Sequence, residues 1–176
     1  MKFSLHLVLG GSRSGKSQHA ETMAAASGLP VRYLATYWAE VADDEMRARI
    51  ESHRRRRPSH WKTIENRHDL TNQILENDGG LLLVDCLTLW LSFQQMRSRP
   101  AESILEELEQ ALTTARERES SLILVSNEVG TGLVPATPEG RSFGDLCGCA
   151  NQLVARHATR VEYIIAGLPM VLKGGC

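Results

Sequence analysis

The sequence has few of the features on which secreted, membrane-spanning and disulfide-stabilised proteins depend. Its 4 cysteines among 176 residues lack the density and spacing of a secreted disulfide framework, so we expect reduced thiols. No apolar run approaches the length of a membrane span, and the short apolar stretch near the N-terminus leads directly into glycine-rich sequence, unlike a signal peptide. These absences predict a cytoplasmic protein without a membrane span.

Excess charge of either sign and aromatic residues are also scarce. The formal net charge is -1 and aromatic residues make up 5%, so the chain has neither a general attraction to polyanions nor a basic surface interleaved with aromatics. We therefore predict that it has no nucleic-acid partner. The one concentrated charge is a run of four arginines, Arg54 to Arg57. Such a run is most often a solvated helix end, but a nearby triphosphate site would give it a function.

Nothing in the composition divides the chain. It has no Pro/Gly/Ser-rich linker, internal repeat or low-complexity tract, and its 42% apolar content is sufficient for one core. We predict a single catalytic domain that covers residues 1–176.

Short apolar segments alternate with helical patterns along the chain. Several of the apolar segments are continuously apolar, which is typical of strands buried on both faces of a mostly parallel sheet. The predicted strands are Ser4–Leu9, Val31–Ala35, Trp61–Ile64, Leu81–Asp85, Leu122–Ser126 and Val161–Ala166. The predicted helices are Lys16–Ala26 before Gly28, a segment from Asp43 or Asp44 to Arg57 before Pro58, and one with an apolar stripe from Ile104 to Ala115.

A phosphate-binding loop follows the first predicted strand. The pattern G-x-x-x-x-G-K-[ST] is complete in Gly10, Gly11, Ser12, Arg13, Ser14, Gly15, Lys16 and Ser17. Its glycines let backbone N–H groups converge on phosphate oxygens, and the next helix adds its positive N-terminal end. We expect catalytic Lys16 to contact the β- and γ-phosphates and the Ser17 hydroxyl to bind Mg²⁺. Together with the strand–helix alternation, this loop predicts an α/β, P-loop NTPase-like (RecA-like) three-layer fold with a mostly parallel central sheet.

A second magnesium anchor is expected at the end of another apolar strand. Asp85 closes the segment Leu81–Asp85 and fits this role, although an acid there also serves as a cap for the following helix. The phosphate loop favours the magnesium role, and Glu128 is the alternative anchor. At this stage the residues predict a nucleoside triphosphate site without specifying its reaction.

Several linked motifs indicate a family. They are GGSRSGKS at 10–17, YLAT at 33–36, DEMRARI at 44–50 with His53, RP at 57–58, WKTIE at 61–65, VDCLTLWLS at 84–92, SNEVG at 126–130, VP at 134–135 and AGLP at 166–169. In this order they resemble the bifunctional adenosylcobinamide kinase/adenosylcobinamide-phosphate guanylyltransferase family of cobalamin biosynthesis. The resemblance extends from the first strand to Lys173.

The resemblance implies two reactions and a catalytic histidine. GTP or ATP phosphorylates the aminopropanol hydroxyl of adenosylcobinamide, and GTP then donates GMP through a histidine–GMP intermediate, which yields adenosylcobinamide-GDP and pyrophosphate. His53 occupies the position of the histidine that carries GMP. A neutral imidazole nitrogen is a competent nucleophile toward phosphorus. The implied cofactor is Mg²⁺, and we expect a homo-oligomer.

The resemblance also implies a set of nucleotide contacts. In this sequence they are Gly10–Ser17, Ala35, Thr36, Tyr37, Arg54, Arg55, Arg56, Arg57, Glu65 and Asp85. The arginines would hold the α-phosphate and the departing pyrophosphate. Glu65 would accept hydrogen bonds from guanine or ribose, or is an exposed acid at a strand end. His6, His19, His60, His68 and His157 belong to none of these motifs, and we take them as structural or exposed.

The sequence departs from the family pattern at Phe93, where asparagine is common, and at Gly144 and Cys149, where arginine is usual. Two lost positive charges would weaken a phosphate, corrinoid or subunit contact. Two other functions stay open: a P-loop kinase of another small alcohol in which His53 is idle, and a non-enzymatic nucleotide switch. The subunit count, the phosphate donor of the kinase step and the corrinoid pocket do not follow from the sequence.

Overall fold

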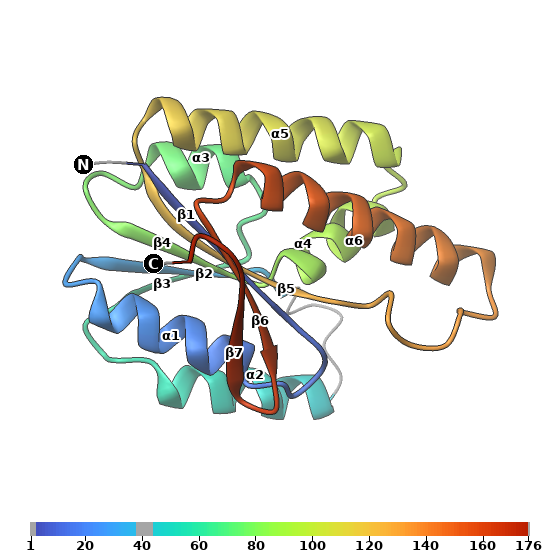
Figure 1. The fold of residues 1–176 in the computed structure, drawn as a ribbon, viewed down its shortest axis with the longest axis horizontal. Helices are drawn as coiled ribbons and strands as arrows, with labels where there is room; N and C mark the ends of the chain where they lie inside the picture. Colours follow the sequence, from blue (N-terminus) through green and yellow to red (C-terminus); the bar gives the residue numbers. More distant parts are fainter. Residues whose placement is uncertain (1–2, 38–43, 176) are drawn as a thin grey trace.

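A single mixed sheet forms the centre of the protein. The structure, a computed structural model, describes residues 3–37 and 44–175. Within these ranges the sheet has seven strands in the order β3-β2-β4-β5-β1-β6-β7 (Figure 1). All neighbouring strands are parallel except β6 and β7, which are antiparallel. The strands are β1 (Ser4–Gly10), β2 (Val31–Ala35), β3 (Lys62–Glu65), β4 (Leu81–Asp85), β5 (Ser121–Asn127), β6 (Arg160–Ile165) and β7 (Leu168–Lys173).

Helices cover both faces of this sheet (Figure 1). Helices α1 (Lys16–Ala26) and α2 (Asp44–Arg56) lie on one face. The other face is covered by α3 (Leu70–Leu75), α4 (Leu87–Met96), α5 (Ala101–Glu117) and α6 (Pro138–His157). The described part of the chain has no helix that is both long and apolar enough to cross a membrane. This layering confirms the predicted three-layer α/β fold with a mostly parallel sheet.

The core explains why the strand segments are continuously apolar. In β4, Leu82 and Val84 pack into the cluster beneath α3–α6, whereas Leu81 and Leu83 pack into the cluster beneath α1. Both faces of the strand are therefore buried, and no polar position remains to create an alternating pattern. The stripe on α5 is also buried in the first cluster, as expected from its spacing.

Four of the six predicted strands differ from the structure by one residue at one or both ends, and two of these differences have a clear local cause. Trp61 was expected to begin β3, but its N–H donates to the Pro58 carbonyl in a turn and its buried ring stacks on Tyr33 with the ring centroids 6.4 Å apart. It belongs to the core as a side chain and not as a strand residue. Ala166 was expected to end β6, but its φ of 51° places it in the following turn.

Strand β7 was not predicted. All six of its residues are exposed, and Pro169 interrupts the apolar sequence, so neither alternation nor burial marks it. The turn from β6 to β7 has positive φ at both Ala166 and Gly167, which suits a tight antiparallel hairpin. This turn also supports the phosphate loop, because the Gly167 N–H donates to the Ser14 carbonyl over 2.8 Å.

The first two helices begin and end close to the predicted residues. Helix α1 covers the predicted range, and Gly28 follows it with a φ of 70°. Helix α2 begins at Asp44 and ends at Arg56, two residues before Pro58. The alternative start, Asp43, lies outside the described residues.

Candidate active site

The phosphate loop lies at the carboxyl end of β1, near the middle of the sheet. Gly15 has a φ of 94° and immediately precedes α1, so the backbone turns directly into the helix N-terminus. A Cβ on Gly10 would lie 2.5 Å from Ser14 Oγ and 2.8 Å from the Ile164 carbonyl oxygen, and only glycine fits there. Lys16 Nζ donates to the Gly11 carbonyl over 2.9 Å, which holds its ammonium against the loop.

Asp85 connects the phosphate loop to the neighbouring strand β2. Its two carboxylate oxygens have different partners: Ser17 donates to Oδ1 over 3.2 Å, and the Tyr33 hydroxyl donates to Oδ2 over 2.5 Å. Burial raises the pKa of Tyr33 well above 10, and the nearby Asp85 charge raises it further, so the phenol remains a donor. A hydroxyl opposite a carboxylate is an oxygen pair of the kind that Mg²⁺ prefers.

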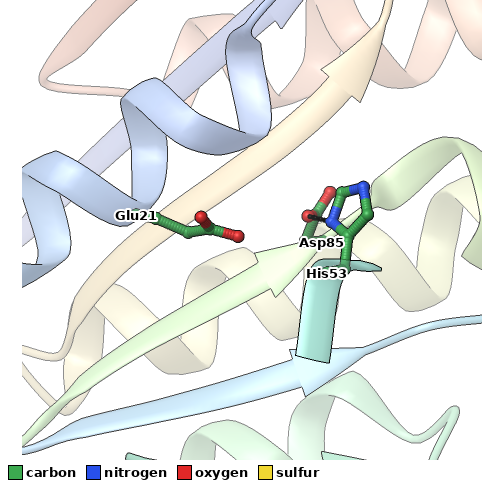
Figure 2. A group of neighbouring side chains, drawn as sticks. All are labelled: Glu21, His53 and Asp85. Carbon is green, nitrogen blue, oxygen red and sulfur yellow. Dashed lines mark ion pairs between the residues drawn. The ribbon is translucent and has the colours of Figure 1, made fainter. Parts of the chain in front are cut away.

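Helix α2 brings His53 to the same carboxylate. His53 Nδ1 lies 3.7 Å from Asp85 Oδ2 and 3.3 Å from Arg56 Nη2. A third titratable side chain, Glu21 of α1, points toward this pair (Figure 2). Burial raises the pKa of Glu21, while its ion-pair partner Arg56 opposes that shift. Side chains of α1, β2 and α2 thus converge on Asp85 of β4.

The four predicted arginines have different surroundings. Arg54 donates to both carboxylate oxygens of Glu65, over 2.9 and 2.5 Å, and to the Tyr37 hydroxyl. The hydrogen bond from Arg54 lowers the pKa of Glu65. Arg57 lies over the Tyr33 ring at 3.7 Å, and its Nε and Nη1 atoms are buried without a hydrogen-bond partner among the described residues.

Arg56 contacts His53 and Glu21, and its side chain is 41% exposed. Arg55 instead pairs with Glu51 on the outer surface of α2. The structure therefore brings three of the four arginines together around His53 and its neighbours, and leaves Arg55 outside.

The end of β2 and the two residues that follow it are buried, but only two of these three residues line a cavity. Ala35 and Tyr37 line the cavity beside Asp85. Thr36 has no exposed surface, and its hydroxyl accepts from the Cys86 N–H over 2.8 Å and donates to the Cys86 carbonyl over 2.6 Å. In this structure the Thr36 side chain holds the backbone that follows Asp85.

Two adjoining hollows share the catalytic candidates. Lys16, Ser17 and His53 line both of them. The more open hollow follows the phosphate loop and includes Arg56. The more enclosed one extends beside β2 and β4 and includes residues that the sequence did not single out as site residues, notably Tyr33 and Asn127. His53 therefore stands between the hollow along the phosphate loop and the adjoining cavity.

The sequence did not indicate Glu21 or Tyr33 as site residues, although Tyr33 lies within the YLAT motif. The only local signal for Glu21 is its position four residues after Ser17, which places both on one face of α1. The alternative magnesium anchor, Glu128, accepts from the Gly130 N–H over 2.8 Å through its own Oε1.

The positions that depart from the family pattern lie elsewhere. The Phe93 ring stacks on His68 with their centroids 3.5 Å apart, and both residues line a separate polar hollow beside α3 and α4. Cys149 is exposed and Gly144 is partly exposed on α6.

Comparison with solved structures supports the fold. A KaiC-like protein from the archaeon Pyrococcus horikoshii has a TM-score of 0.52 at 15% identity, over 91% of this chain and 70% of that one. At this identity the likeness concerns the fold alone, and it confirms the predicted P-loop NTPase-like architecture.

Comparison with sequences supports the family. The family model described as cobinamide kinase/cobinamide phosphate guanyltransferase matches residues 6–172. The bifunctional adenosylcobalamin biosynthesis protein CobP of Pseudomonas aeruginosa is 45% identical over 170 residues, which are 96% of each chain. The bifunctional protein CobU of Escherichia coli is 34% identical over 185 residues, 95% of this chain and 98% of the relative. Because the match covers nearly all of both chains, this chain belongs to the cobinamide kinase/cobinamide phosphate guanyltransferase family.

Proposed function

We propose that this chain carries out both family reactions around one set of residues: phosphorylation of adenosylcobinamide by GTP or ATP, then transfer of GMP from GTP through His53. The observation that carries the proposal is the position of His53, which lines the phosphate-loop hollow and the adjoining cavity together with Lys16 and Ser17. A histidine there can reach a nucleotide on one side and an acceptor on the other.

The kinase step requires positioning and charge compensation. Backbone N–H groups of the phosphate loop and the N-terminus of α1 would hold the β- and γ-phosphates, with Lys16 against their oxygens. Ser17 Oγ and Asp85 Oδ1 face each other over 3.2 Å and are suitable Mg²⁺ ligands. Mg²⁺, when bound, supplies charge neutralisation of the triphosphate. The substrate hydroxyl oxygen then bonds to the γ-phosphorus, the bond between the γ-phosphorus and the β–γ bridging oxygen breaks, and the hydroxyl proton is released to solvent.

The transfer step uses the imidazole of His53 as nucleophile. One ring nitrogen bonds to the α-phosphorus of GTP, the bond to the α–β bridging oxygen breaks, and pyrophosphate leaves. A phosphate oxygen of adenosylcobinamide phosphate then attacks the same phosphorus, and the P–N bond breaks. The products are adenosylcobinamide-GDP and unmodified His53.

The surrounding arginines suit the charge that moves during this step. The buried nitrogens of Arg57 lack hydrogen-bond partners among the described residues, and phosphate oxygens would satisfy them. Arg56 already contacts the His53 ring and would follow the α-phosphate or pyrophosphate. Arg54 and Glu65 hold each other, so a guanine or ribose contact by Glu65 would have to share that carboxylate with Arg54.

Covalent labelling tests the proposal. The protein is incubated with Mg²⁺ and GTP labelled in the α-phosphate, and the label is expected on His53 as an acid-labile, alkali-stable adduct. His53→Ala should lose the label and GMP transfer but retain phosphorylation of adenosylcobinamide. His60→Ala, a change at an exposed histidine, is the matched control and should label normally. A label that survives His53→Ala would identify another nucleophile, and kinase activity without any label would favour a monofunctional kinase.

Assembly and cellular location belong to the same proposal. A homo-oligomer is supported by exposed apolar residues on β7, an edge strand of the sheet that includes Leu168, Met170 and Leu172. The cytoplasmic location rests on the cysteine content and on the reactions proposed above.

A further inference from the structure

Glu21, His53 and Asp85 form a cluster of potential metal ligands that the reactions above do not fully use (Figure 2). The three side chains come from α1, α2 and β4, and one ligand atom of each lies within 4.8 Å of the others. His53 Nδ1 and Asp85 Oδ2 are 3.7 Å apart. Each side chain is mostly shielded from solvent, with exposed fractions of 11%, 21% and 10% for Glu21, His53 and Asp85.

A cation already lies beside this cluster. Arg56 Nη2 is 3.3 Å from His53 Nδ1 and 3.5 Å from Glu21 Oε1. Within the described ranges, Glu21 Oε1 is buried and accepts no hydrogen bond, so this long ion pair is the compensation that the structure gives it. Glu21 thus relies on one partly exposed guanidinium, which can turn outward from the last turn of α2.

We propose that Glu21, His53 and Asp85 bind a divalent transition-metal ion such as Zn²⁺ or Co²⁺, which replaces the Arg56 guanidinium. One imidazole nitrogen with two carboxylate oxygens suits these ions, whereas Mg²⁺ prefers oxygen ligands alone. The site is distinct from the proposed magnesium position, because Asp85 would use Oδ2 here and Oδ1 toward Ser17.

The distances are compatible with small side-chain movements. Ligand bonds of about 2.1 Å in a tetrahedral site place neighbouring ligand atoms about 3.4 Å apart. The pair formed by His53 and Asp85, at 3.7 Å, is already close to that separation. Since all three ligand atoms lie within 4.8 Å, the widest pair must close by at most about 1.4 Å, which a rotation of the Glu21 side chain can supply.

An ion at this position would block GMP transfer, a consequence that rests on the proposed role of His53. With the metal on Nδ1, the imidazole proton resides on Nε2, so neither nitrogen keeps a lone pair for the α-phosphorus. The ion would also tie α2 to α1 and β4. Metal binding itself requires only the three ligands and is independent of the assigned reaction.

Cobalt spectroscopy tests the site without an activity measurement. Nucleotide-free, full-length protein in buffer with excess Mg²⁺ is titrated with Co²⁺, and an intensified visible absorption band with one ion per chain is expected. His53→Ala and Glu21→Gln should each weaken binding at least about tenfold. Arg56→Met should tighten it, because the competing guanidinium is gone. His60→Ala is the control for exposed histidines and should bind as the wild type does.

A second measurement avoids the risk that a variant misfolds. Histidine ring signals of the wild type are followed by NMR as Co²⁺ is added, and the His53 signals should broaden or shift at the lowest ion concentrations. Absence of the visible band, unchanged affinity in Glu21→Gln, or a first effect on another histidine would overturn the proposal. If Co²⁺ binds as expected but does not suppress GMP labelling, the metal site stands and the proposed nucleophile fails. If no Co²⁺ binds and GMP labelling is normal, the metal site fails and the proposed nucleophile stands.

Discussion

Replacing Asp85 with asparagine separates the role of charge at the phosphate loop from the role of shape. The carboxylate has partners on two sides, Ser17 at Oδ1 and Tyr33 at Oδ2. An amide keeps the size and one acceptor oxygen, so it can still accept from the buried Tyr33 hydroxyl. It then presents N–H₂ toward Ser17, where a magnesium ion would contribute to triphosphate binding.

The expected loss follows from the distance. An ion in contact with Ser17 Oγ, 3.2 Å from Asp85 Oδ1, lies within about 4 Å of the carboxylate. At that separation one pair of unit charges is worth about 4 kcal/mol at an effective dielectric constant of about 20. The cost of desolvating the carboxylate and the ion cancels part of this attraction. A net loss of about 2 kcal/mol, or roughly thirtyfold in magnesium-dependent affinity, is therefore expected.

Calorimetric titration of the triphosphate at several Mg²⁺ concentrations measures this loss. Wild type should bind more tightly as Mg²⁺ rises, whereas Asp85→Asn should bind weakly and almost independently of Mg²⁺. Tyr33→Phe is the matched control, because it removes only the hydrogen bond to Oδ2 and should keep the magnesium dependence. An unchanged magnesium dependence in Asp85→Asn would refute the assignment and move the anchor to another acid, with Glu128 the first to test.

Three further changes examine the loop and its surroundings. Lys16→Ala should abolish both reactions without altering the free energy of unfolding in urea by more than about 0.5 kcal/mol, and normal kinase turnover in that variant would exclude the loop as the triphosphate site. Gly15→Ala should destabilise the fold by about 1–2 kcal/mol in urea unfolding and weaken nucleotide binding. The reason is that φ is 94° at this position and the added Cβ would lie 3.2 Å from Gly167 Cα. An unchanged free energy of unfolding would contradict this close approach. Glu65→Gln should destabilise the protein above pH 4.5 and progressively less as the pH falls further. Arg54 lowers the pKa of Glu65 below its ordinary 4.5, so the folded state binds fewer protons than the unfolded state and the stabilisation is lost in acid. A pH-independent difference in stability between variant and wild type would argue against the ion pair.

Local patterns predicted the parts of the fold that one short segment determines. The phosphate loop needs a strand, glycines and a helix start in immediate succession, and all three lie between Ser4 and Ala26. The buried strands were visible because parallel strands between two helical layers are apolar throughout. Strand β7 escaped prediction because its exposed residues carry no periodic pattern, and Trp61 was misassigned because burial of one large ring resembles the beginning of a strand.

The candidate site was harder to predict because it depends on convergence. Glu21 and Tyr33 belong to elements with clear structural roles of their own, and only the packing of α1 and β2 around β4 brings them to Asp85. Thr36 shows the opposite case. The sequence predicted a nucleotide contact there, and the structure uses its hydroxyl on the Cys86 backbone, while the contact itself stays a prediction.

The position of β1 has a consequence for how the protein is made. Its strand partners are β5 and β6, and the loop that follows it is supported by the turn at Gly167. A ribosome that has just synthesised the GGSRSGKS segment must add more than a hundred residues before β5 or β6 exists. At typical synthesis rates the interval from Gly10 to Gly167 is roughly 8–30 s. The nascent chain therefore carries the phosphate-loop sequence long before the strands and the turn that support it exist, and under the proposed function GTP would stabilise only a nearly finished molecule.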